Sequence, residues 1–175
     1  MMMRLSREDG LSLIETGIAT AILVVVLPGL LSVLSVAAAI TENEGHLSAR
    51  AAEYAQDKME QLVALAYSDI ASDTTQIPTT PSNGTGLAVG GSADTNAPAA
   101  KYFDYLDDQG KPLCPCAGTT PPGTWFYKRV WQIALPAGTT DIKQITVTVV
   151  VAHSIAKKII PRATVTTLRA RIGNE

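Results

Sequence analysis

An uncharged apolar stretch near the N-terminus constrains this chain more than any other feature. Residues 17–40 contain no Asp, Glu, Lys or Arg. As a helix that rises about 1.5 Å per residue, the stretch would cross a hydrocarbon core of roughly 30 Å. The pattern therefore predicts a helix that spans a membrane once.

A single acid, Glu15, stands just before this stretch. A carboxylate inside a bilayer costs about 2.5–3.5 kcal/mol, so such residues are rare and usually functional. The leader "MMMRLSREDG" is short and polar, and the apolar part that follows is longer than that of a secretory signal. Arg4 and Arg7 would hold the N-terminus of an uncleaved anchor in the cytoplasm. That interpretation explains the span but leaves Glu15 unexplained.

The segment "G-LSLIE", residues 10–15, resembles the class III signal of type IV prepilins and pseudopilins. In that signal a charged leader ends in Gly, a large apolar residue follows, and Glu is the fifth residue of the mature chain. The resemblance implies that a prepilin peptidase cuts between Gly10 and Leu11 and methylates the Leu11 amine. Leu11 stands where the family usually has Phe.

Cleavage would give Glu15 a cationic partner. A new α-amino group on Leu11 is mostly protonated at neutral pH, and Leu11 and Glu15 stand four residues apart on one helix face. The resemblance implies instead that Glu15 meets the amine of a neighbouring subunit as a filament grows. Either pairing removes an uncompensated charge from lipid. The alternative is a Glu that reaches the membrane surface at a helix end.

Pro28 and Gly29 interrupt the apolar stretch. Proline removes a helical hydrogen bond and clashes with the preceding turn, which predicts a kink or local opening there. The resemblance suggests a place where the helix bends or melts on packing. A proline that the membrane helix simply tolerates is the alternative.

Residues 41–71 are predicted to continue the helix as an amphipathic half. Apolar residues recur at three- and four-residue steps, and the opposite face carries charges that we expect to be solvated. A continuous helix over residues 11–71 would be on the order of 90 Å long. The segment "AQDKMEQLVAL", residues 55–65, also resembles the corresponding helix of minor pilins and pseudopilins. The apolar stripe comprises Leu47, Ala51, Tyr54, Ala55, Met59, Leu62, Ala66 and Ile70, and the charged face Arg50, Glu53, Asp57, Lys58 and Glu60.

Residues 72–100 are rich in Thr, Pro, Ser, Asn and Gly and predict a long variable loop. Residues 101–175 predict an antiparallel sheet, with strands over 101–107, 124–135, 142–153 and 162–172 joined as a meander. Trp125, Tyr127, Trp131, Ile133 and Leu135 would share an apolar face. Arg129 would lie on that face too and would need an edge position or a partner. The apolar sheet face should cover the helix, giving an α+β fold.

This order of helix, loop and sheet resembles the pilin fold. The segments "ITVTV" and "TVTTLRAR" also resemble the C-terminal strands of minor pilins of the pilus-modification type. Altogether the resemblance divides the chain into a leader (1–10), a transmembrane or filament-core half-helix (11–40), an amphipathic half-helix (41–71), the loop (72–100) and the sheet head (101–175).

Cys114 and Cys116 could form a disulfide, but a ring closed across one residue is strained. Free thiols and pairing with another chain are the alternatives. Their spacing does not match structural zinc, even with His46 and His153 as further ligands, so we expect no metal there.

Two further groups of charged residues could each form a binding site or simply be solvated surface residues. The acids at 104, 107 and 108 precede Gly110 and could bind calcium, which some pseudopilins bind, although a solvated turn fits them better. A small basic cluster lies between the last two strands and could contact an anionic partner or form a soluble hairpin tip. That cluster comprises His153, Lys157, Lys158 and Arg162.

The sequence shows no nucleophile–base pair, phosphate loop or metalloprotease motif, so we expect neither an enzyme nor a cofactor. The resemblance implies a minor type IV pilin whose partners are other pilin subunits, the prepilin peptidase and the inner membrane, with the head in the periplasm and later in a filament. A minor pseudopilin of a type II secretion system is an alternative. A single-span protein with an outer ligand-binding or enzymatic domain is another. The net charge of −2 does not favour nucleic acid as a partner.

Overall fold

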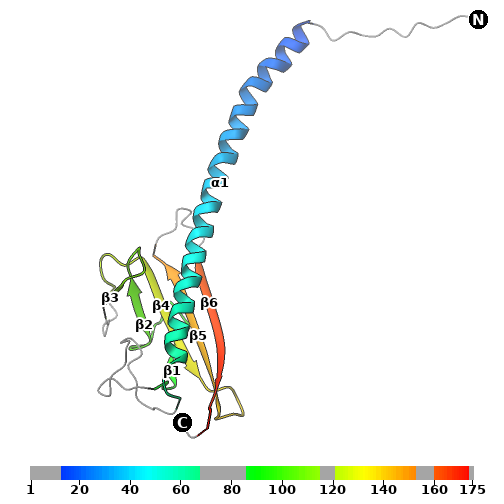
Figure 1. The fold of residues 1–175 in the computed structure, drawn as a ribbon. Helices are drawn as coiled ribbons and strands as arrows, with labels where there is room; N and C mark the ends of the chain where they lie inside the picture. The colour runs from blue at the N-terminus through cyan, green and yellow to red at the C-terminus, as the bar shows by residue number, and fades with distance from the viewer. Residues whose placement is uncertain (1–12, 68–85, 115–120, 153–159, 174–175) are drawn as a thin grey trace, which may run out of the picture. The chain divides into compact units, whose positions relative to one another are not determined.

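The computed structural model describes residues 13–67, 86–114, 121–152 and 160–173. One helix, α1 (Leu13–Val63), precedes six strands: β1 (Gly90–Gly91), β2 (Phe103–Leu106), β3 (Pro112–Cys114), β4 (Tyr127–Ala134), β5 (Ile142–Val151) and β6 (Arg162–Ala170). The predicted α+β class is confirmed (Figure 1). The chain divides into two compact units, Met1–Glu42 and Asn43–Glu175, and α1 runs through the boundary between them.

The described part of the first unit is entirely helical. Its apolar side chains are exposed, as at Leu13 (93%), Val25 (75%) and Val33 (67%). α1 is long and apolar enough to cross a membrane, a criterion that an N-terminal signal sequence would also meet.

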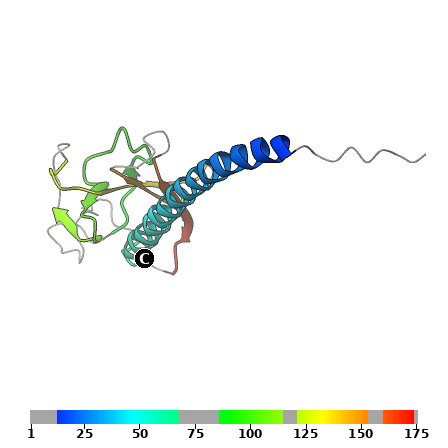
Figure 2. The same ribbon diagram turned by 90° about the horizontal axis from the view of Figure 1, so that it is seen from above.

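The helix continues through Pro28 and Gly29 without a break (Figure 2). Because Pro28 has no N–H, the Val24 carbonyl loses its usual partner, but the helical turns on either side persist. The predicted local opening is thus absent from this structure. Melting on assembly stays a prediction.

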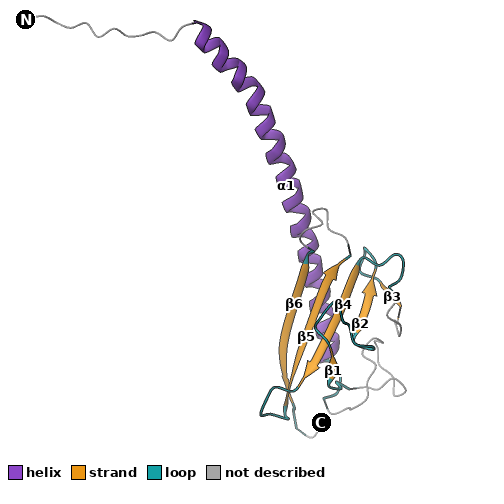
Figure 3. Cartoon of the chain, turned by 180° about the vertical axis from the view of Figure 1, so that it is seen from behind, coloured by secondary structure: helices purple, strands orange, loops and turns teal. Residues whose placement is uncertain are grey.

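In the second unit, one face of α1 is buried against the sheet. Leu47, Ala51, Ala55, Met59 and Leu62 are buried, which confirms the predicted apolar stripe over these turns. They form one core with inward-facing residues of β4 and β5. Figures 1 and 3, taken from opposite sides, show the helix on one face of the sheet only.

α1 ends at Val63 rather than near Ala71. After Val63 the chain turns so that Leu65 and Tyr67 are both buried. The Leu87 N–H donates to the Ala66 carbonyl (2.7 Å), and the Tyr67 hydroxyl donates to the Thr140 carbonyl (2.8 Å). These contacts need an irregular segment, because a continuing helix would have used the Ala66 carbonyl for its own ladder.

The sheet is antiparallel throughout, in the order β3-β2-β4-β5-β6. β4, β5 and β6 form the predicted meander (Figure 3). β3 lies outside β2, so the whole sheet is not a simple meander. β1 and β2 pair with different parts of the same edge of β4.

The predicted loop 72–100 is partly core. Leu87 and Ala88 are buried, and β1 pairs with β4. Gly91 has φ +87°, and a Cβ there would lie 2.2 Å from the Trp131 carbonyl oxygen. Only glycine allows so close a backbone approach. The glycine-rich composition that predicted a loop here is therefore also compatible with the short strand β1.

The two sheet faces differ in what they bury. The predicted inward residues of β5, which are Ile145, Val147, Val149 and Val151, are all buried in the main core. Two assignments on the neighbouring segment were wrong. Trp125 precedes β4 and packs with Phe103, Tyr105 and Val130 on the opposite face, and Leu135 is 44% exposed after the strand ends.

Candidate functional site

The first candidate site is the exposed, apolar part of α1 over residues 13–40. Glu15 lies in its first turn and is exposed among apolar neighbours. The hydroxyls of Thr16 and Thr20 donate to carbonyls of the preceding turn, at 3.0 and 2.7 Å, and Ser32 donates to Gly29 at 2.8 Å. These bonds satisfy the polar side chains within the helix, which suits an apolar environment.

Gly10 and Leu11, the predicted processing site, lie outside the described residues. The pairing of Glu15 with the Leu11 amine is therefore a prediction still to be tested. The described helix does place Glu15 at the start of the apolar surface.

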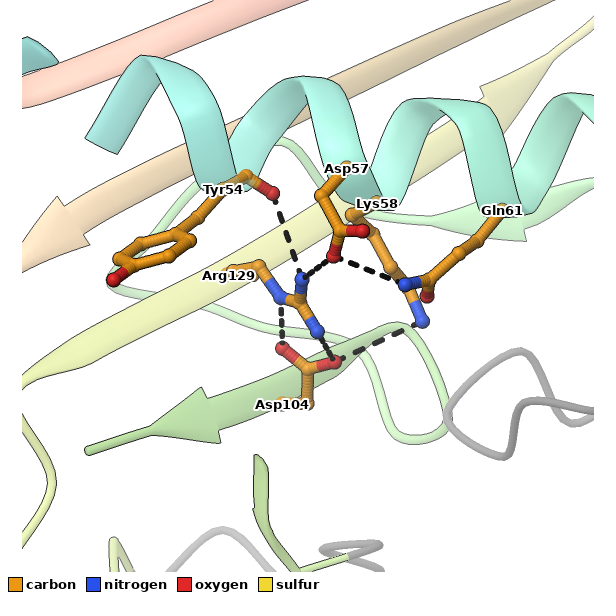
Figure 4. Close-up of polar contacts among 6 residues, drawn as sticks. All are labelled: Tyr54, Asp57, Lys58, Gln61, Asp104 and Arg129. Atoms are coloured by element: carbon orange, nitrogen blue, oxygen red, sulfur yellow. Dashed lines mark hydrogen bonds and ion pairs between the residues drawn. The ribbon is translucent and has the colours of Figure 1, made fainter. Parts of the chain in front are cut away.

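The second candidate site is a buried charge cluster between α1 and the sheet (Figure 4). Arg129 on β4 and Asp104 on β2 stand directly opposite each other and face the helix. The Arg129 Nε donates to Asp104 Oδ1 at 2.7 Å, and its Nη2 donates to Oδ2 at 2.8 Å. Nη1 donates to Oδ2 of Asp57 on α1 at 3.0 Å. Arg129 thus connects two strands to the helix.

Lys58 completes this cluster from the helix side. Its side chain is 1% exposed, and Nζ lies 3.7 Å from Asp104 Oδ2 and 4.1 Å from the Trp131 ring centre. Burial lowers the pKa of Lys58 to about 8, against the opposing effect of the Asp104 carboxylate. Burial alone would also lower the pKa of Arg129, but Asp104 and Asp57 more than offset it and raise that pKa.

The cluster balances two cations with two carboxylates. A bidentate arginine–carboxylate pair fixes geometry, and removing one partner leaves a buried charge uncompensated. We therefore interpret the cluster as the element that sets how the helix lies on β2 and β4. Its polar groups are engaged with one another, as Gln61 also shows by donating to Asp57 at 3.0 Å.

The sequence anticipated part of this cluster. Arg129 on an apolar face was expected to need a partner, and Asp104 and Asp57 are its partners. The expectation that Lys58 is solvated was wrong, because position 58 lies between Ala55 and Leu62 on the buried stripe. Sequence reasoning had set Asp104 beside a calcium loop rather than opposite Arg129. The sequence did contain a signal for this pair, because Arg129 needed an acidic partner and Asp104 lies on another predicted strand.

A second buried lysine, Lys143 on β5, was missed altogether. It is 7% exposed, and its Nζ donates to the carbonyls of Tyr67 and Leu87, the latter at 2.6 Å. Nζ also lies 4.4 Å from the Tyr67 ring centre. Lys143 thus holds the irregular segment after α1 against the sheet.

The residues of the proposed calcium loop form a turn. Asp107 Oδ1 accepts from the N–H groups of Gln109 (2.9 Å) and Lys111 (2.8 Å), and Gly110 has φ +80°. Both are properties of an Asp-initiated turn. Within the described ranges, no group of three or more His, Cys, Asp or Glu is placed to hold a metal ion.

The remaining candidates are only partly described. Cys116 lies outside the described residues and Cys114 ends β3, so the disulfide and zinc alternatives are untested. Of the basic cluster, Arg162 begins β6, whereas His153, Lys157 and Lys158 fall outside.

Comparisons with family models, with curated proteins and with solved structures found no match to this chain. The long apolar helix packed on an antiparallel sheet is consistent with a pilin-like fold.

Proposed function

We propose that this chain is a minor type IV pilin, a structural subunit that is held in the inner membrane and then enters or initiates a pilus-like filament. One observation carries the proposal. A single unbroken helix leaves its apolar N-terminal half exposed and packs one face of its C-terminal half on the sheet.

The exposed half requires a cover that the described residues do not supply. Burial of apolar surface is worth about 25 cal/mol per Å², and this half exposes large side chains on all sides. A bilayer would cover it in the monomer, and the helices of other subunits would cover it in a filament. We propose that this half-helix moves from the bilayer into the filament, as expected of a pilin.

Glu15 supports the same proposal. An acid at the start of an otherwise uncharged surface favours pairing with a cation over free insertion in lipid. The resemblance of residues 10–15 to a class III signal provides that cation as the processed amine of Leu11. A minor pseudopilin would have the same features. The charges of the cluster at Arg129 are engaged with one another, so we propose no catalytic role for them.

Intact-mass measurement of the membrane-extracted chain tests the proposal. We expect loss of residues 1–10 and one added methyl group on Leu11. Gly10→Leu should retain the leader, whereas Gly45→Leu, a matched change at an exposed helical glycine with open space around it, should be processed normally. An unprocessed wild-type chain would support the single-span alternative and contradict the proposal.

A further inference from the structure

The outer face of the sheet, opposite α1, carries a hollow that the proposed function does not use. Its volume is about 630 Å³, within the range of small-molecule sites. This face is turned to the viewer in Figure 3. The hollow lies over β2, β4, β5 and the start of β6.

The sheet register places four lining residues in one row. Tyr105 pairs with Lys128, Lys128 with Val150, and Val150 with Arg162. Neighbouring strands lie about 4.8 Å apart, so the Lys128 and Arg162 backbones stand roughly 10 Å apart with an apolar residue between them. Long side chains from both positions can reach one ligand above Val150.

An aromatic wall closes one end of the row. The Trp125 indole is half-buried and packs edge-to-face on Tyr105, with ring centres 5.3 Å apart. Tyr105 itself is 2% exposed, so the indole is the aromatic surface open to a ligand. Asn96 stands exposed among the lining residues and offers an amide that both donates and accepts.

The charged residues that line the hollow in the described part of the chain are both cations, Lys128 and Arg162, and the Asp94 carboxylate acts on Lys128 from outside the lining. Lys128 Nζ donates to the Thr95 carbonyl at 2.7 Å, which leaves further N–H donors on the ammonium. Burial lowers the pKa of Lys128, with Asp94 acting against it, so an anion placed beside Nζ would stabilise the charged form. Arg162 is exposed and forms no ion pair with the described residues. None of the described residues that line the hollow is an acid.

We propose that this hollow binds an acidic sugar, a pyranose ring that carries a carboxylate. The C–H face of the ring would pack on the Trp125 indole, the carboxylate would pair with Lys128 and Arg162, and the hydroxyls would pair with Asn96. Single-stranded nucleic acid fits less well, because it needs successive stacking surfaces and the hollow offers one. The proposal does not depend on filament assembly.

Calorimetric titration of the full-length chain in non-ionic detergent tests this site, with sodium glucuronate, glucose and AMP as ligands. We expect glucuronate to bind with Kd on the order of 1 mM and glucose at least about tenfold more weakly. Lys128→Gln and Arg162→Gln should each weaken glucuronate binding about tenfold. Arg171→Gln, an exposed arginine outside the hollow, is the matched control and should bind as wild type does.

Three results would overturn the proposal: no glucuronate binding in the millimolar range, equal binding of glucose, or tighter binding of AMP. Arg162 is exposed, so Arg162→Gln should keep the fold even if Lys128→Gln does not. Unchanged glucuronate affinity in a folded Arg162→Gln variant would equally rule the site out.

Discussion

The two halves of α1 belong to one continuous helix but have opposite environments. Over residues 13–40 large apolar side chains are exposed, whereas between Leu47 and Leu62 the apolar stripe is buried, with Tyr54 partly so and its other members at 9% exposure or less. The described core between the helix and the sheet is formed by residues of the second half of α1. Apolar character alone therefore does not determine burial. Whether an apolar helix face is buried depends on whether the same chain provides a surface that packs against it.

The charges follow the same division. In the first half Glu15 is the only ionisable residue before Glu42 in the described helix. In the second half Asp57 and Lys58 meet Arg129 and Asp104, so charges near the core are balanced within the chain. Among the described residues Glu15 forms no ion pair, which is a reason to look for its partner at the processed N-terminus or on another chain.

Removal of residues 1–42 should have the largest effect. Because the second unit contains its own core, we expect a soluble, folded domain that no longer associates with membranes. Membrane fractionation together with circular dichroism would measure both properties. An insoluble product would show that the two halves of α1 are not separable as described.

Disruption of the buried charge cluster should have the second-largest effect. Arg129→Met leaves the buried Asp104 without its bidentate partner, and we expect a loss of about 3–5 kcal/mol in the free energy of unfolding. Arg50→Met, which removes the exposed pair with Glu53, should cost about 1 kcal/mol or less. Denaturant titration would compare them. Equal losses would contradict the structural role of the cluster.

The same substitution in the two halves tests the comparison directly. Leu62→Ala should cost about 2–5 kcal/mol in the free energy of unfolding, because Leu62 is fully buried. Leu31→Ala should leave the stability of the sheet domain unchanged, since Leu31 is 64% exposed. The free energy of unfolding would be measured by chemical denaturation, monitored through a signal from the sheet domain. If Leu31→Ala lowered the free energy of unfolding of the sheet domain, the two halves of α1 would not differ as described.

The pH dependence of Lys58 is the smallest expected effect. Its pKa is about 8 in the folded chain and about 10.5 in the unfolded one, so the unfolded chain binds more protons between these values and stability rises with pH. Burial raises the pKa of Tyr102, Tyr105 and Tyr127, which lowers stability above about pH 10.

Stability should therefore be compared between pH 8 and 10. Lys58→Met should remove a rise of about 2 kcal/mol in the free energy of unfolding there. An unchanged pH profile in the folded variant would show that Lys58 does not titrate as described.

The features with a clear period were predictable from the sequence. The β5 alternation and the helical stripe depend on local spacing, and both are confirmed. The need of Arg129 for a partner followed from one charged residue on an apolar face.

The features that depend on long-range contacts were not predictable. α1 ends early because Tyr67, Leu87 and Lys143 come together from distant segments. β1 forms because Gly91 lets the backbone approach Trp131 closely, although glycine locally suggests a loop. Lys58 lies on the buried stripe, and its burial depends on the Asp104 carboxylate, which comes from a strand far away in the sequence.

The most direct test of the account is the incorporation of Glu15→Ala into filaments. The variant should insert in the membrane normally but be strongly depleted from the sheared filament fraction, because it cannot neutralise the terminal amine of a neighbouring subunit. Glu42→Ala, an exposed acid of the same helix, should be incorporated like the wild type. Equal incorporation of Glu15→Ala and wild type would contradict the proposed role of this acid.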